Sequence, residues 1–576
     1  MLKLRIQIAD LNVQLVQSDN RSLIGVGTFR ESLIRVLESL DDGAPESRLN
    51  QLLAAVDDAN LIHVVHPEKR PERAVAYRSI LSNRDLYYFE LHDSTLLITD
   101  SFRNVLANIS PSERIINEHA ISDLLLFRTT PPDETYLEGL GRLGHGVRRE
   151  WDQTGARESI IGRLEPSGST DPFGQQEIEE FLIDLIDETP LGERKVNLLS
   201  GGVDSTLMQT YLPNDFPSVS IGVDSAEFAD EVAYARRAAK LLHNPHQEII
   251  VPETEYLGVV SDAIESCCLP PHHVQVMVPD TIMRDTDYKD YLTAEFADIT
   301  FGLPNVPRHE LTHRFRDIGT LLSVINAGAW LPGELGAKAR RLIAFGRSIR
   351  APVDSWQALG ASASTFTEMD LAKSLLGTGE VKSRIERRAG YVAARFSNED
   401  SSAVPLYRHI EFTHVVSLLC EETIVLWRQM AMARGKSLHA PFASNRLFGR
   451  ALDIPVEQRY VRNGEAKFLL KDMLARRLPG FDVAIPKRGG LPIERWFQSG
   501  PFRNGFKTYG RPDFLSDKEF SELNRAGGWL RWTLLTYVMW KKLCISNPDI
   551  SLCPETQVFE YYDGVVPIPS EVAQSN

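Results

Sequence analysis

The stretch that decides the fold is Val196-Asn197-Leu198-Leu199-Ser200-Gly201-Gly202-Val203-Asp204-Ser205-Thr206-Leu207-Met208. A short apolar run meets glycines and serines, and a helix-compatible run follows, which predicts a strand, a loop and a helix that opens on the loop. Glycines let backbone N–H groups approach an anion, hydroxyls donate further hydrogen bonds, and the positive end of a helix dipole favours negative charge. We therefore predict a phosphate-binding loop at Ser200–Ser205.

Asp204 needs its own explanation, because a carboxylate in this loop would repel a phosphate directly. It is better placed to hold a Mg²⁺ ion that the phosphates also ligate. An ordinary Gly-Ser turn is the alternative for the Ser-Gly-Gly tripeptide alone, and the strand-loop-helix context favours the anion site. The loop is not a Walker loop, since no Gly-Lys pair closes it.

Composition describes a globular chain of several domains. The chain has 576 residues, 43% of them hydrophobic and 24% charged. A net charge of −15 argues against nucleic-acid and membrane-surface binding and favours a small-molecule amino acid or peptide as substrate. The five cysteines form no CxxC pair, and no apolar run approaches the roughly 18 residues of a membrane span. We expect a cytoplasmic protein, and its oligomeric state stays open, a homodimer included.

The first part of the chain alternates short apolar and polar runs as far as about residue 162. This pattern predicts a β-rich domain, with one hairpin whose strands are Leu86–Leu91 and Leu96–Thr99. Helices are predicted at Arg30–Leu40 and Glu118–Leu126. The Gly, Ser and Pro residues of Pro166–Gly174 indicate a linker.

The second part alternates strands and helices. A helix at Gln176–Glu188 precedes the loop, and the strands Val219–Val223 and His246–Val251 flank a helix at Glu227–Leu242. This order predicts a parallel sheet with helices on both faces. Ligands of such sheets lie at the carboxyl ends of the strands, where Ser200–Ser205 is predicted.

A second acidic motif follows at Asp290–Gly302, where an apolar run ends in Glu295 and Asp298. Two carboxylates beside a phosphate site are costly unless a cation or an amine lies between them. The run considered alone is equally well explained as a solvated first turn of a helix.

These motifs resemble a known family. Ser200–Ser205 resembles the pyrophosphate loop of the ATP pyrophosphatases, which cleave ATP to AMP and pyrophosphate. With Asp290–Gly302, Arg428–Phe442 and Gly464–Pro492, it resembles the asparagine synthetase superfamily over about residues 176–540. The implied fold is α/β: a degenerate glutaminase-like (Ntn-type) β-sandwich, then a parallel-sheet ATP-pyrophosphatase domain with a helical extension. The expected boundaries are 1–165 for the first domain, 166–175 for the linker, 176–550 for the synthetase domain and 551–576 for a tail.

The resemblance also implies a site that uses ATP and Mg²⁺. Lys487 would stabilise the oxyanion of amide formation, Glu295 would face the second substrate, and Asp204 and Asp298 would hold the metal. ATP and its pyrophosphate would contact Ser200, Gly201, Gly202, Asp204, Ser205, Ile221, Gly222, Thr293, Ala294 and Lys467.

Departures from the family pattern narrow the function. Leu2 holds the position of the nucleophilic cysteine of the family's glutaminase, and the first cysteine is Cys267, so glutamine hydrolysis by that mechanism is excluded. His439 and Ser444 stand for an Arg and an Asp, which argues against aspartate held as in asparagine synthetases. Phe296 replaces a common glycine.

We therefore predict an AMP-forming ligase that adenylates a substrate carboxylate and closes a lactam with an amine of the same substrate. His246–Glu255 and Ala297–Ile299 resemble β-lactam synthetases of antibiotic biosynthesis most. Lasso-peptide macrolactam synthetases, ammonia-dependent amide ligases and a non-catalytic scaffold are the alternatives. Glu295 stands where β-lactam synthetases have a tyrosine that acts as the base and deprotonates the amine. Its partner is not assigned among Glu421, Glu422 and Gln429.

Overall fold

The computed structural model describes most of the chain. The described residues are 2–27, 57–167, 169, 173–225, 229–273, 278–302, 352–353, 355–395, 406–415, 423–462, 465–484, 492–523 and 527–562. The helix predicted at residues 30–40 lies outside them.

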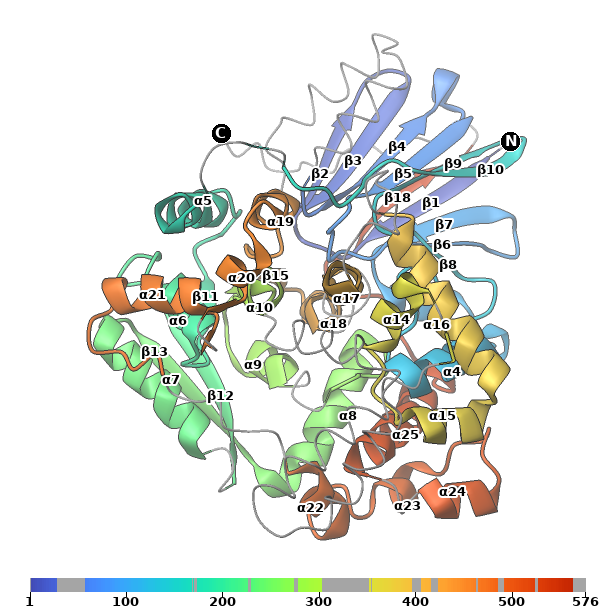
Figure 1. Cartoon of the computed structure of the whole chain (residues 1–576). Coiled ribbons are helices and arrows are strands. Elements are labelled where there is room, and N and C mark those ends of the chain that lie inside the picture. Colours follow the sequence, from blue (N-terminus) through green and yellow to red (C-terminus); the bar gives the residue numbers. More distant parts are fainter. Residues whose placement is uncertain are drawn as a thin grey trace.

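The first domain is built on two stacked β-sheets, at the upper right of Figure 1. One sheet has the order β18 (Gln557–Tyr561), β1 (Lys3–Ile8), β7 (Thr95–Thr99), β6 (Tyr87–Glu90) and β8 (Gly141–Arg142). The other has the order β10 (Gly155–Ile160), β9 (Val147–Asp152), β5 (Arg73–Arg78), β4 (Ala59–Val65), β3 (Arg21–Gly27) and β2 (Val13–Gln17). The predicted hairpin is the antiparallel pair β6–β7.

Alternation of side chains explains how these sheets pack. In β1, Leu4, Ile6 and Ile8 point to one side and are fully buried. They share a core with Ile62 of β4 and Ala76 of β5 in the facing sheet. The sequence therefore places one apolar face of each sheet inside a sandwich.

Two helices of the first domain pack against helices of the second. They are α3 (Phe102–Asn108) and α4 (Glu118–Phe127). Each begins at a capping residue: the Ser101 side chain accepts a hydrogen bond from the Asn104 N–H, and the Asn117 side chain accepts one from the His119 N–H. The predicted helix at Glu118–Leu126 is thus confirmed within one residue.

The second domain contains the predicted parallel sheet. Its order is β13 (His246–Pro252), β12 (Ser218–Asp224), β11 (Lys195–Leu198), β14 (Asp290–Leu292) and β15 (Ser437–His439). All four neighbouring pairs are parallel. The α/β fold class with an N-terminal two-sheet domain is therefore confirmed.

Helices surround this sheet and extend from it (Figure 1). Those of the sheet region are α5 (Gln175–Asp187), α6 (Val203–Gln209), α7 (Ala229–Leu242), α8 (Tyr256–Cys267), α9 (Val278–Asp285) and α10 (Ala297–Phe301). The extension begins with α14 (Trp356–Ser362), α15 (Met369–Leu376), α16 (Thr378–Ala393), α17 (Leu406–His414), α18 (Val425–Ala433), α19 (Asn445–Leu452) and α20 (Val456–Arg459). It ends with α21 (Phe468–Arg477), α22 (Ile493–Gln498), α23 (Gly505–Tyr509), α24 (Asp517–Leu523) and α25 (Gly528–Trp540). A hairpin of β16 (Val461–Arg462) and β17 (Glu465–Ala466) precedes α21.

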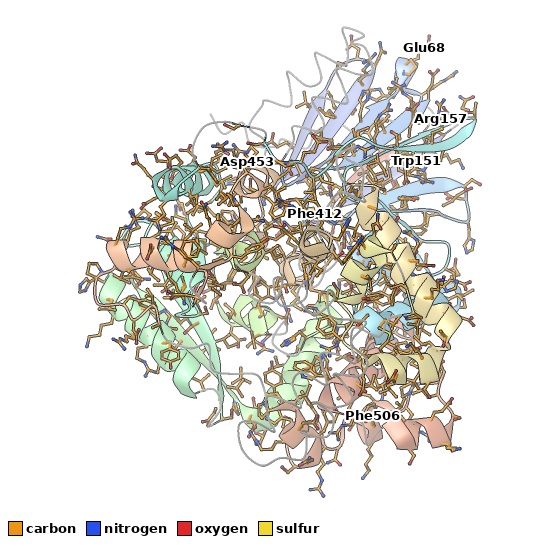
Figure 2. All side chains as sticks on the ribbon, viewed as in Figure 1. Glu68, Trp151, Arg157, Phe412, Asp453 and Phe506 are labelled. Carbon is orange, nitrogen blue, oxygen red and sulfur yellow. The ribbon has the colours of Figure 1, made fainter. Side chains whose placement is uncertain are left out.

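The main core crosses the domain boundary. Leu106 of α3 and Leu124 of α4 belong to the same apolar cluster as Leu199 and Trp540. Side chains fill the space between the ribbons, and Phe412 of α17 lies near the centre of the molecule (Figure 2). None of the helices in the described ranges is long and apolar enough to cross a membrane.

The segment expected to be a tail contains β18. This strand pairs antiparallel with β1, with Phe559 opposite Ile6. Phe559 and Tyr561 are buried in the core of the first domain. The two domains are thus joined both at residues 166–175 and at this later strand.

Candidate active site

The ends of three neighbouring strands form the candidate site. β11 ends at the predicted phosphate loop, β12 lies on one side of it, and β14 lies on the other. Because all three strands are parallel, their carboxyl ends meet at the same edge of the sheet. The residues predicted from separate motifs therefore come together.

The two serines of the loop are bonded to each other. The Oγ atoms of Ser200 and Ser205 are 2.9 Å apart, and the Ser200 N–H donates to Ser205 Oγ over 3.1 Å. The Gly202 N–H donates to Ser200 Oγ over 3.2 Å. These bonds fix a tight turn between β11 and α6.

Two glycines of the predicted site are required by packing. Gly201 has a φ of +72°, and a Cβ there would overlap the backbone of Tyr234 and Ala235 in α7. A Cβ at Gly222 in β12 would overlap the Val232 side chain of the same helix. Both glycines let the loop and the strand lie directly against α7.

The remaining predicted nucleotide contacts lie beside the loop. Ile221 is half-buried in β12. Thr293 follows β14, where its N–H donates to the His439 carbonyl over 2.9 Å and its Oγ1 accepts from the Glu295 N–H over 3.2 Å. Ala294 is buried next to it. Their contacts with ATP stay predictions.

Asp204 and Asp298 are joined through Lys467. The Lys467 Nζ lies 2.5 Å from Asp204 Oδ2 and also forms an ion pair with Asp298 Oδ1. The side chains of Asp204 and Lys467 are 21% and 20% exposed, and that of Asp298 is 48% exposed. Three predicted residues from distant segments thus form one cluster that is open to solvent.

Unusual backbone conformations shape this cluster. Phe296, which precedes α10, has a φ of +83°, and Lys467, which precedes α21, has a φ of +58°. Left-handed φ values in non-glycine residues cost on the order of 1–2 kcal/mol and concentrate at functional sites. The glycine that Phe296 replaces would adopt this conformation without strain. Phe296 packs instead on Phe448, with ring centroids 6.2 Å apart.

The two carboxylates suit a divalent cation. Both offer oxygen ligands, which Mg²⁺ prefers, and they already hold a cation in the form of the Lys467 ammonium. The Oδ1 atom of Asp204 is buried and accepts no hydrogen bond from any described residue. A metal held here would need water and phosphate oxygens to complete its ligands. The described residues contain no group of three or more His, Cys, Asp or Glu side chains that could hold a metal alone.

The sequence profile described as asparagine synthase matches residues 193–525, more than half of the chain. The chain belongs to the asparagine synthase family. Members of this family are ATP-dependent ligases that form amide bonds and generally use Mg²⁺. The match includes the phosphate loop, Asp298, Lys467, and the strands β14 and β15.

No curated protein matches the sequence. Among solved structures, the U34-tRNA thiolase NcsA from Methanococcus maripaludis with its 4Fe-4S cluster matches at 12% identity and a TM-score of 0.18, over 41% of this chain and 90% of that chain. An allosteric regulatory enzyme of purine biosynthesis matches at 10% identity and a TM-score of 0.16, over 42% of this chain and 63% of that chain. These TM-scores are too low to inform the fold or the function.

The acceptor side of this asparagine synthase family member differs from the sequence expectation in one respect. Ser444 stands for a family Asp, yet a carboxylate lies beside it: the Ser444 Oγ donates to Asp57 of the first domain over 2.6 Å. Asp57 also accepts from the N–H of Asn445, at the start of α19, over 2.7 Å. Nothing in the sequence around Asp57 indicates this contact, because it joins residues from different domains.

His439 at the end of β15 is buried. Its Nε2 lies 3.1 Å from Asp290 Oδ1, and only 3% of the residue is exposed. Burial lowers the pKa of His439 below its ordinary value of 6.5, although the hydrogen bond to the Asp290 carboxylate acts in the opposite direction. His439 is therefore a neutral residue in the wall behind the site at neutral pH.

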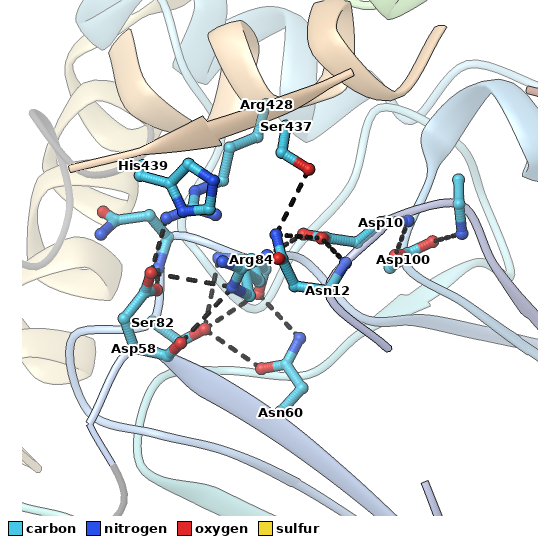
Figure 3. Close-up of polar contacts among 12 residues, drawn as sticks. Asp10, Asn12, Asp58, Asn60, Ser82, Arg84, Asp100, Arg428, Ser437 and His439 are labelled. Atoms are coloured by element: carbon cyan, nitrogen blue, oxygen red, sulfur yellow. Dashed lines mark hydrogen bonds and ion pairs between the residues drawn. The ribbon is translucent and has the colours of Figure 1, made fainter. Parts of the chain in front are cut away.

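A buried charged network joins the two domains behind β15 (Figure 3). Arg84 of the first domain forms ion pairs with Asp10 and Asp58, and Arg428 of α18 lies 2.5 Å from Asp58 Oδ2. The Asn12 side chain donates to Ser437 Oγ over 3.3 Å. We call Asp10, Asp58, Arg84 and Arg428 the interface network.

Burial shapes the charges of this network. Burial lowers the pKa of Arg428 and raises that of Asp58, against the attraction between these two residues. Burial also lowers the pKa of Arg84, and the like charge of Arg428 lowers it further. Neighbouring Asp100 accepts from the N–H groups of Ala9 and Asp10, and burial raises its pKa to about 7. These groups depend on one another to stay charged.

The remaining predicted site residues divide into two groups. Lys487, Glu421 and Glu422 lie outside the described residues. Gln429 lies in the domain interface, where its Oε1 accepts from the Phe102 N–H over 3.1 Å and its Nε2 donates to the Asp100 carbonyl over 2.9 Å. These contacts explain Gln429 as a structural residue.

The structure adds a cluster that the sequence did not indicate. Glu411 of α17 forms ion pairs with Arg459, 2.5 Å away, and Arg408, 3.0 Å away, and accepts from the Tyr460 hydroxyl. Glu411, Arg459 and Tyr460 are fully buried. The Tyr460 carbonyl accepts from the Lys467 N–H over 3.2 Å, so this cluster anchors the hairpin that leads to Lys467.

Proposed function

We propose that this protein is an AMP-forming lactam synthetase that activates a carboxylate with ATP and closes a ring with an amine of the same substrate. Within the asparagine synthase family it would be most like a β-lactam synthetase. The observation that carries the proposal is the meeting of Asp204, Asp298 and Lys467 beside the Ser200–Ser205 loop.

The first step would be adenylation. An oxygen of the substrate carboxylate attacks the α-phosphorus of ATP. The bond between this phosphorus and the oxygen that bridges the α- and β-phosphates breaks, so pyrophosphate leaves and an acyl-adenylate forms. The Ser200–Ser205 loop would bind the pyrophosphate through its hydroxyls and N–H groups. A Mg²⁺ ion held by Asp204 and Asp298 would neutralise charge on the phosphates.

The second step would be ring closure. The substrate amine attacks the acyl carbon and loses a proton, and AMP leaves. Glu295, half-buried after β14, is our candidate for the residue that accepts this proton. By its resemblance to the family pattern, Lys487 would stabilise the tetrahedral oxyanion.

The source of the amine favours the lactam over an ammonia-derived amide. Leu2 directly precedes β1, and residues 1–266 contain no cysteine that could hydrolyse glutamine. The interface network also fills part of the boundary between the two domains with buried ion pairs. These features support an amine that arrives with the substrate.

The side chains near β15 favour a substrate other than aspartate. His439 is buried against Asp290, and Ser444 is bonded to Asp57, so neither presents the charge of the residue it replaces. The Asp57 carboxylate beside Ser444 is itself paired with Arg446 at 3.2 Å. We propose an amino acid or peptide acid bound without the family's Arg and Asp pair, in a cytoplasmic enzyme.

A pyrophosphate-release assay tests the proposal. Purified protein with Mg-ATP would be given β-amino acids, linear core peptides, and aspartate with ammonium chloride. We expect release with an acid that carries its own amine, with the cyclised product lighter by one water in mass spectrometry. Cyclised peptides would identify a macrolactam synthetase. Turnover only with ammonium would contradict the lactam proposal, and no turnover with any acid would favour a scaffold.

Lys487→Ala provides a second test. We expect product formation to fall by at least about 100-fold while ATP binding is retained, because removal of one oxyanion donor typically costs that much. Lys382→Ala, at an exposed lysine of α16, is the matched control. An unchanged product yield in Lys487→Ala would remove Lys487 from the mechanism.

A further inference from the structure

The Lys467 ammonium occupies the position of a cation between Asp204 and Asp298. It lies 2.5 Å from Asp204 Oδ2 and pairs with Asp298 Oδ1. These are the two side chains with which the proposed function would bind a metal. The same two carboxylates therefore have a resident cation supplied by the chain itself.

The backbone of Lys467 is firmly held. Its N–H donates to the Tyr460 carbonyl, and the buried Glu411 holds Tyr460 and Arg459 on the other side of the β16–β17 hairpin. The stem of the Lys467 side chain lies against Gly302, where a Cβ would overlap its Cγ. Gly302 thus provides the space through which Lys467 reaches the carboxylates.

The ammonium end of Lys467 is much less constrained. The side chain is 20% exposed, and Asp298 is 48% exposed. A lysine ammonium is a compact charge on a flexible stem of four carbons, with donors that adapt to different acceptors. The partial exposure of the side chain would let the amino group exchange one set of oxygen partners for another while the backbone stays in place.

Electrostatics determines when that exchange is favourable. Two adjacent carboxylates repel each other, and one ammonium bound to both relieves the repulsion. A divalent cation that arrives alone must displace the ammonium from both carboxylates and brings no new anionic partner for it. A cation that arrives with a triphosphate brings new anionic oxygens, and a phosphate oxygen replaces the carboxylates as the partner of Lys467.

We propose that Lys467 is an exchangeable counter-ion that keeps the two carboxylates closed to free divalent cations and yields when the metal arrives with nucleotide. The proposal rests on the proposed function, since it takes the pair as the metal site. Its chemistry makes the enzyme selective for a metal–nucleotide complex over the free metal. Lys467 acts here as a positioning residue.

Mn²⁺ binding without nucleotide tests this proposal. Free Mn²⁺ would be measured by electron paramagnetic resonance while the full chain is titrated, for wild type, Lys467→Met and Lys467→Gln. We expect both variants to bind Mn²⁺ at least about tenfold more tightly than wild type, because the competing cation is gone. Equal affinities in wild type and both variants would overturn the proposal.

Lys471→Met is the matched control. Lys471 lies in α21, the helix that Lys467 precedes, and pairs with Glu465 at 2.8 Å. We expect its Mn²⁺ affinity to equal that of wild type. Tighter Mn²⁺ binding in Lys471→Met would mean that any lost positive charge has this effect, and it would contradict a specific role for Lys467.

A stability measurement covers the case in which a variant folds poorly. Thermal unfolding of each protein would be followed with Mn²⁺ and with EDTA, both without nucleotide. We expect Mn²⁺ to raise the melting temperature more in Lys467→Gln than in wild type. An equal rise would count against the proposal.

A titration that includes nucleotide distinguishes a failure of this proposal from a failure of the proposed function. Wild type would be titrated with Mn²⁺ and a non-hydrolysable ATP analogue together, and we expect both to bind. Failure to bind the analogue would contradict the proposed function, whereas the comparison of Lys467 variants without nucleotide would still decide the counter-ion role.

Discussion

Two charged clusters of this protein use the same kinds of side chain in opposite ways. In the interface network, Arg428 and Arg84 are 4% and 2% exposed, and their carboxylate partners come from another part of the chain. In the candidate site, Lys467 is 20% exposed and its partner Asp298 is 48% exposed. The arginines of the first cluster are almost fully covered, although Asp58 keeps 16% exposure, whereas Asp298 of the second cluster is open to solvent.

The difference in burial decides what each cluster does. Buried ion pairs are expensive to break, because the remaining charge has no water around it. Exposed pairs contribute little to stability, since water and salt compete for the charges. The interface network therefore fixes two domains together, while the open cluster is free to exchange partners with a ligand.

The largest effect is expected from Arg428→Met. It leaves the largely covered Asp58 without its 2.5 Å partner and with only the more distant Arg84, and we expect the free energy of unfolding to fall by about 3 kcal/mol. Urea unfolding measures this loss. Arg511→Met, in an exposed pair with Asp517, should cost less than about 1 kcal/mol. A similar small loss for Arg428→Met would break the comparison between the two clusters.

Gly201→Ala tests whether the loop beside the open cluster needs its tight backbone packing against α7. The added methyl group would overlap α7 in addition to the strain of a positive φ, so we expect a loss of about 1–3 kcal/mol and weaker nucleotide binding. Gly139→Ala is the control: its φ is +73°, and nothing lies within 4 Å of the new Cβ. Equal losses in both variants would show that strain alone is responsible and that packing on α7 is not.

The pH dependence of His439 provides a smaller effect. Because the folded pKa of His439 is lowered, its stabilising contribution is complete above pH 6.5 and is lost as the pH falls below it. Relative to His439→Gln, wild type should lose about 1.4 kcal/mol for each unit of pKa lowering. Urea unfolding of both proteins between about pH 7.5 and 5 measures this. Parallel pH profiles would contradict a buried neutral histidine.

The smallest effect is expected from Asp204→Asn in protein free of metal and nucleotide. Its pair with Lys467 is partly exposed, so the free energy of unfolding should change by less than about 1 kcal/mol. Thermal unfolding in EDTA measures it. A loss as large as that of Arg428→Met would show that the open cluster is as structural as the buried one.

The longer strands of the parallel sheet could be predicted from the local sequence pattern. The strands β12 and β13 have seven residues each and were predicted together with the parallel arrangement. β14 and β15 have three residues each, which is too short for any periodicity to show. Tertiary pairing with β11 and with each other makes them strands.

The residues of the candidate site that belong to sequence motifs could be predicted. The loop, Asp204, Asp298 and Lys467 were predicted, and the structure brings them together. Asp57 and Glu411 were not, because their roles depend on partners far away in sequence: Asp57 contacts Ser444, and Glu411 contacts Arg459. No local spacing records such contacts.

Strand β18 has a consequence for the order of folding. The first domain needs Phe559 and Tyr561 to complete its core and β18 to cover the edge of β1. During synthesis these residues are made only after the whole synthetase domain. The first domain must therefore wait with an open sheet edge, and its closure requires that the synthetase domain has already been made.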